Sequence, residues 1–63
     1  MEQQGFVFRD RETGGEGYCS VRTVGDSIGV ATSVASGGDL EVFLAPADAQ
    51  KLAELLLKAA SQP

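Results

Sequence analysis

The chain has 63 residues, a formal net charge of −4 at pH 7, one cysteine and no histidine. Its length predicts one small domain over residues 1–63, and the lack of a second cysteine and of histidine excludes an internal disulfide and a Cys/His zinc site. A chain this short gains little stability from its own core, so we expect a second polypeptide to supply the missing burial.

Four short strands are predicted from apolar and β-branched residues bounded by glycine-rich turns. They cover residues 6–9, 18–24, 28–35 and 40–44, and they are separated by a loop over 11–17 and turns over 25–27 and 36–39. Connections this short join antiparallel neighbours, which predicts a meander. Residues 1–4 and 61–63 are expected to be flexible tails.

A helix is predicted to begin at Pro46, because proline suits the first helical position. Asp48 in the first turn and Lys58 near the end both interact favourably with the helix dipole, whereas Ala45 is a poor N-cap. The predicted fold class is α+β: a four-stranded antiparallel meander followed by one C-terminal helix packed on the sheet, in the order ββββα.

The predicted helix carries apolar side chains over a wider arc than packing against one sheet requires. Its apolar side chains span an arc of roughly 200°, whereas a helix that covers one core typically shows a stripe of roughly 100° or somewhat more. We expect Leu52 and Leu56 to cover the sheet, with Leu55 and Leu57 on opposite flanks of that stripe. The pattern predicts a homodimer interface drawn from Leu52, Leu55, Leu56, Leu57 and Ala59. The alternative is a single-chain helix with an exposed leucine, which is common.

Alternation of side chains gives the predicted sheet one apolar face for the helix and one mixed face. On the mixed face, Arg9 and Arg22 are suited to an anionic group, and Tyr18 and Phe43 to stacking against a planar ring. Ser33 belongs to a line of small side chains that leaves room for close approach to the backbone. We interpret these five residues as candidate binding residues. Three uses stay open: a solvated face, a face buried against a second sheet, or a surface for a nucleotide-like ligand, single-stranded nucleic acid or a peptide.

The sequence carries no catalytic or cofactor signature. The glycine-rich loop at 14–17 lacks the lysine of a phosphate loop. Cys19 has no histidine base to activate it and is expected to be a small buried core residue. The acids at the turns show no calcium-binding pattern, so no metal and no cofactor is expected. A carboxylate pair at the turns, Asp26 and Asp39, is the one catalytic route left open, and we expect no enzyme.

The element order, ending in "LEVFLAPADAQKLAELL", resembles that of the small dimeric single-strand-binding transcriptional coactivators related to the whirly proteins. The resemblance implies a dimer formed through the helix and a sheet that meets nucleic acid. This chain departs from that pattern because it is acidic and its predicted strands carry only Arg9 and Arg22 as cations.

We therefore expect a small non-catalytic homo-oligomeric binding or interaction module, of the bacterial or phage regulator or inhibitor type. Its expected partners are a second copy and another protein or a small anionic ligand, including a ligand held in a pocket between two copies. The alternative is a single-stranded nucleic-acid-binding domain that uses the arginines and aromatic residues of the mixed face, which the acidic charge disfavours. No stretch approaches the ~20 apolar residues of a membrane span. One unpaired cysteine and no visible export signal predict a cytoplasmic protein.

Overall fold

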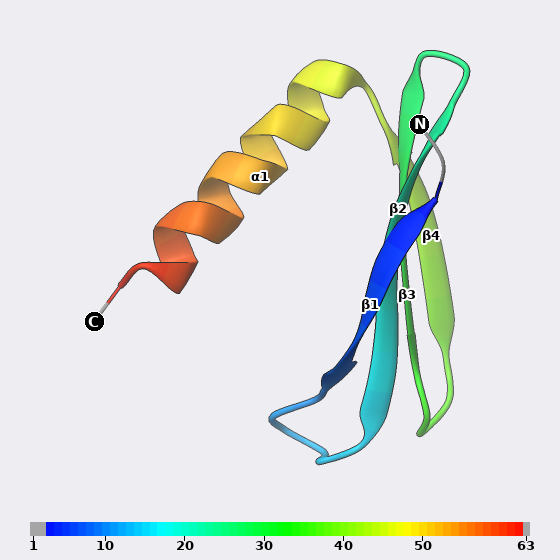
Figure 1. Cartoon of the computed structure of the whole chain (residues 1–63), viewed down its shortest axis with the longest axis vertical. Helices are drawn as coiled ribbons and strands as arrows, with labels where there is room; N and C mark the ends of the chain where they lie inside the picture. Colours follow the sequence, from blue (N-terminus) through cyan, green and yellow to red (C-terminus); the bar gives the residue numbers. More distant parts are fainter. Residues whose placement is uncertain (1–2, 63) are drawn as a thin grey trace.

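The computed structural model describes residues 3–62 and has the predicted element order. Strands β1 (Gln4–Arg9), β2 (Glu16–Val24), β3 (Ser27–Val34) and β4 (Asp39–Leu44) form one sheet, and helix α1 (Pro46–Ala60) follows (Figure 1). Neighbouring strands are antiparallel and lie in the order β1-β2-β3-β4. The predicted α+β fold, a meander followed by one helix, is confirmed.

The first hairpin is longer than the sequence predicted. β1 begins at Gln4, which pairs with Val21, so Gln4 belongs to the sheet and not to the expected tail. β2 begins at Glu16, which pairs with Arg9. Residues 1–2 and 63 of the predicted tails lie outside the described residues.

Glycines shape the two tight connections on either side of β3. Val24 pairs with Ser27, so Gly25 and Asp26 form a two-residue hairpin loop. Gly25 has φ 60°, and glycine at the first central position is typical of a type II′ turn. The predicted turn between β3 and β4 contains Gly37 and Gly38, with φ 110° and 98°, a conformation that glycine adopts without steric cost.

Helix α1 is well terminated at its end and poorly capped at its start. Ala45 is the N-cap and makes no side-chain capping hydrogen bond, and Asp48 and Lys58 lie in the first and last turns as predicted. At the end, the Ser61 hydroxyl donates to the carbonyls of Leu57 (2.9 Å) and Lys58 (3.1 Å). Within residues 3–62, no helix has the length and apolar character needed to cross a membrane.

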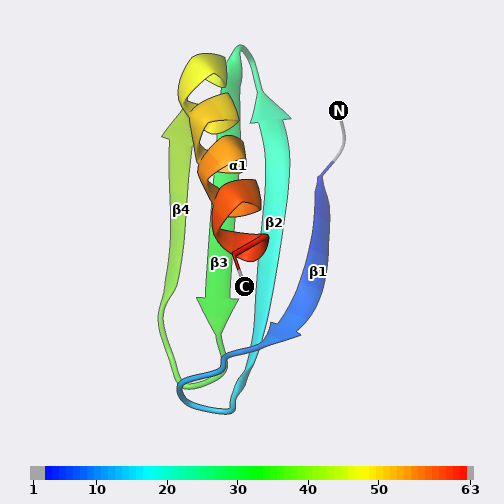
Figure 2. The same ribbon diagram turned by 90° about the vertical axis from the view of Figure 1, so that its left-hand side faces the viewer.

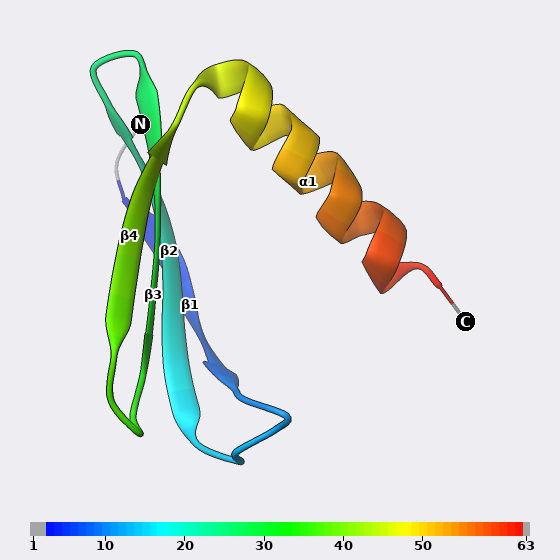
Figure 3. The same ribbon diagram turned by 180° about the vertical axis from the view of Figure 1, so that it is seen from behind.

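The helix lies over one face of the sheet but diverges from it along its length (Figures 1 and 3). It comes close to β3 and β4 and makes no close contact with β1 or β2, and Figure 2 shows β1 standing clear of the helix. As a result, no hydrophobic side chain is buried in the part of the chain that the structure describes. The buried residues there are Gly17, Ser20 and Gly29, all within the sheet. The helix therefore packs on the sheet near its beginning, and the rest of it stands away.

Candidate functional site

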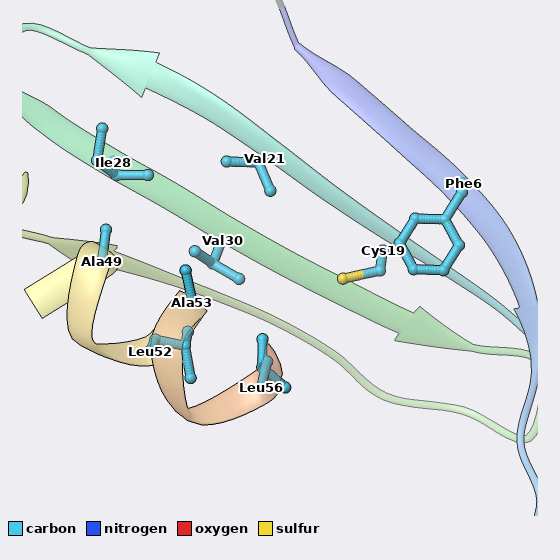
Figure 4. Close-up of a pocket in the computed structure, with 9 residues that line it drawn as sticks. All are labelled: Phe6, Cys19, Val21, Ile28, Val30, Ala49, Leu52, Ala53 and Leu56. Carbon is cyan, nitrogen blue, oxygen red and sulfur yellow. The ribbon is translucent and has the colours of Figure 1, made fainter. Parts of the chain in front are cut away.

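An apolar groove with a volume of about 420 Å³ lies between α1 and the sheet. Figure 4 shows its side chains, which come from β1, β2, β3 and the helix. None of them carries a charge, so the groove suits apolar side chains or an apolar ligand and is unsuited to an ion. The lining residues are Phe6, Cys19, Val21, Ile28, Val30, Ala49, Leu52, Ala53 and Leu56.

The helix leucines become more exposed toward the end of α1. Leu52 is 37% exposed, and Leu56, one turn later on the same side of the helix, is 61% exposed. Both line the groove and so face the sheet, although they were predicted to cover it. They do not close the core, however, because the space between them and the sheet stays open (Figure 4).

The five residues predicted for a dimer interface are all exposed. Leu52 and Leu56 lie in the groove, whereas Leu55, Leu57 and Ala59 lie outside its lining. Their role in a dimer stays a prediction. The sequence predicted that the sheet face lining the groove is apolar and carries the helix, and it did not predict an open groove there. The alternation of apolar residues correctly placed the strand residues of the groove on one face of the sheet, but it does not indicate how far the helix lies from that face.

The predicted binding residues of the opposite face fall into two groups. Tyr18 pairs directly with Ser33, and Arg9 lies diagonally beside Tyr18 at the same end of the sheet. Arg22 and Phe43 flank β3 on either side, four residues further along β2. Four strand residues span about 13 Å, so the five residues do not converge on one small ligand.

Arg22 is already paired with an acid of its own chain. Its Nε donates to Glu41 Oε2 at 2.9 Å and its Nη2 donates to Glu41 Oε1 at 3.0 Å. The guanidinium carbon also lies 5.7 Å from the centre of the Phe43 ring, a cation–π arrangement. The hydrogen bonds that Arg22 donates to the Glu41 carboxylate, and then the negative charge of that carboxylate, raise the pKa of Arg22. Arg22 is therefore a fixed positive charge whose planar donor edge is occupied.

Gly29 makes room for this cluster. A Cβ atom at Gly29 would lie 3.1 Å from Glu41 Oε2, 3.2 Å from Phe43 Cε1 and 3.3 Å from Arg22 Cγ. The expectation that the small side chains of β3 leave the backbone open to a ligand is therefore wrong at this position, because side chains from β2 and β4 cover it.

Two further predicted residues are also engaged within the chain. Arg9 Nη1 donates to the carbonyl of Gly14 in the loop between β1 and β2. Cys19 has a free thiol, but it is half-buried rather than buried, because it lines the open groove. Among residues 3–62, no three Cys, Asp or Glu side chains are grouped closely enough to hold a metal ion.

No protein-family model matches the chain, and no curated protein or solved structure matches it significantly. The resemblance to the whirly-related coactivators therefore concerns element order alone.

Proposed function

We propose that this protein is a small non-catalytic interaction module that functions as a homo-oligomer, with the apolar groove as the surface of association. This proposal rests on the observation that every hydrophobic side chain of residues 3–62 is at least partly exposed. A chain that folds alone buries some of its large apolar residues, because their burial provides most of the stability. A partner chain that binds in the groove would bury these exposed hydrophobic side chains.

The size of the exposed surface supports association with a second copy. A folded monomer of 6.5 kDa is expected to expose about 3,800 Å², whereas this chain exposes 5056 Å². The excess is on the order of 1,200 Å² per chain, or roughly 2,400 Å² for two copies. Permanent homodimers bury about 2,000 to 5,000 Å², so two copies have enough surface for a stable dimer.

Single-stranded nucleic-acid binding through the mixed face is the alternative. Exposed Tyr18 and Phe43 offer stacking surfaces for it. Affinity for single strands also requires cations that are free to neutralise phosphates. Both candidate arginines, however, already donate hydrogen bonds to groups of their own chain. The geometry thus favours the groove. The dimer's further partner is, in this proposal, another protein. The free thiol of Cys19 fits a reducing compartment such as the cytoplasm.

Sedimentation equilibrium on the wild-type chain and on Leu56→Glu tests the proposal. Leu56 is 61% exposed in one chain, so the substitution should leave a monomer folded. In a dimer, a carboxylate in the closed groove would be buried without a partner, which costs about 2 kcal/mol or more and weakens association roughly 30-fold or more. We expect the wild type to sediment as a dimer at about 10 μM, and we expect the dimer dissociation constant of the variant to be at least roughly 30-fold higher.

Ala47→Glu is the matched control. It adds the same charge to an exposed position of α1 that does not line the groove, so the dimer should persist. A wild-type chain that is monomeric yet stably folded at that concentration contradicts the proposal.

A further inference from the structure

Two apolar surfaces of this chain are left uncovered, and they lie at opposite sides of the same opening. The first is a row across the sheet, formed by direct pairing of Phe6 with Cys19, Cys19 with Thr32, and Thr32 with Leu40. This Phe6–Leu40 row lies on the face that carries the helix, yet Phe6 and Leu40 are each 62% exposed. The divergence of α1 explains the exposure, because the helix makes no close contact with β1 or β2.

The second surface is the C-terminal half of α1. Leu55, Leu56 and Leu57 are consecutive and are 59%, 61% and 72% exposed. Consecutive helical residues point in directions about 100° apart, so these three side chains cover a wide arc of the helix. The sheet of the same chain stands too far away to cover it (Figure 1).

The two surfaces are chemically compatible with each other. The row carries no charged residue, and the helix end presents three leucines, so contact between them leaves no charge buried. A helix with its side chains is about 10 Å across, and it enters an opening between two diverging elements more readily than a flat sheet does. A second copy supplies both surfaces at once, and exchange of the same contact in both directions closes a two-fold dimer.

We propose that the C-terminal half of α1 from a second copy lies in the groove against the Phe6–Leu40 row, and that the two copies exchange this contact reciprocally. This inference rests on the homo-oligomeric function proposed above and specifies its geometry. The apolar core is then completed between the chains: Phe6 and Cys19 of one copy contact Leu56 of the other.

The single cysteine of the chain allows a direct test of this contact. One chain is the wild type, with its thiol at Cys19, and the other carries Cys19→Ser with Leu56→Cys. Each chain then has one thiol, so a disulfide between the two positions forms only across copies. Labelling one of the two chains with ¹⁵N allows mass spectrometry to distinguish this mixed disulfide from disulfide-linked dimers of two identical chains. The control replaces Leu56→Cys by Glu54→Cys, which lies about 160° away around the helix.

After subunit exchange under mild oxidation, we expect the cross-chain disulfide with Leu56→Cys to form about tenfold faster than with Glu54→Cys, because a disulfide requires Cα atoms within about 7 Å. Equal rates in a sample that sediments as a dimer would overturn this geometry. The protein would then still be a homo-oligomer, but its interface would lie elsewhere, for instance at the free edge of β1 or β4, and the groove would not be its surface of association. A monomeric wild-type chain overturns both. Both proposals would also be overturned if native mass spectrometry showed a monomer with a small apolar molecule bound. That result would identify the groove as a ligand-binding site.

Discussion

Gly29 determines which side chains meet on the mixed face. It lies between Arg22 on one neighbouring strand and Phe43 on the other, and its missing side chain lets the Arg22–Glu41 ion pair cross β3. Exposed ion pairs contribute little to stability, so the consequence is mainly chemical: the most promising cation of this face is neutralised. Because its pKa is raised, the stabilisation from Arg22 is fully present below the ordinary arginine pKa. It is lost only as pH rises through the raised value, well above neutrality.

Substitution of Gly29 tests this close packing. In Gly29→Val, the Cβ atom alone would lie 3.1 to 3.3 Å from three neighbouring side chains, and crowding of this kind costs about 1–3 kcal/mol. Removing a glycine from a strand returns about 0.5–1 kcal/mol. We expect a net loss of about 1 kcal/mol in the free energy of unfolding, measured by urea denaturation. Ser33→Val, on the same face of the same strand but paired with Tyr18 and Asp39 instead of with the cluster, is the control and should cost less. A stabilised Gly29→Val would show that the cluster moves aside freely.

At the scale of elements, the junction between β4 and α1 decides the shape of the groove. Ala45 is the one residue between Leu44 of β4 and Pro46 of α1. It has φ −63° and ψ 151°, the extended conformation that a following proline favours. A junction this short leaves the helix little freedom to lie down along the sheet, and α1 leaves the sheet at an angle (Figure 3).

The same junction offers a stabilising substitution. Ala45 caps the helix with no side-chain oxygen, so Ala45→Ser provides an acceptor for a free N–H of the first turn. We expect the free energy of unfolding to rise by about 1 kcal/mol. Ala47→Ser, inside the first turn, should give no gain, because serine is a poorer helix former than alanine. If both variants behave alike in urea denaturation, capping is not the cause.

At the scale of the whole molecule, the single chain is too extended for its length. Its radius of gyration is 12.8 Å, whereas a compact domain of this length is expected near 10.6 Å. The difference has the same origin as the excess surface: the helix stands away from the sheet. In the proposed dimer, the space that makes one chain extended is filled by the other.

Coupling of folding to association predicts a melting temperature that depends on protein concentration. With an unfolding enthalpy of about 0.7 kcal/mol per residue in both chains, a tenfold higher concentration should raise the melting temperature by about 5 °C. Differential scanning calorimetry at two concentrations measures this shift. Leu56→Glu should melt at a lower temperature than the wild type at each concentration, because its dimer is weaker. A wild-type melting temperature independent of concentration would show that one chain is the folding unit.

The sequence by itself determined the strands, the helix and the face on which each strand residue lies. These features depend on local periodicity, on glycines that supply positive φ at Gly25, Gly37 and Gly38, and on proline at the helix start. It also identified more leucine on the helix than one sheet can cover. Only the tertiary structure decided where that excess lies. The angle of α1 depends on the junction at Ala45, and the pairing of Arg22 with Glu41 depends on the register of three strands across Gly29. The first is a relation between two neighbouring elements and the second joins strands distant in sequence, and periodicity within one segment records neither.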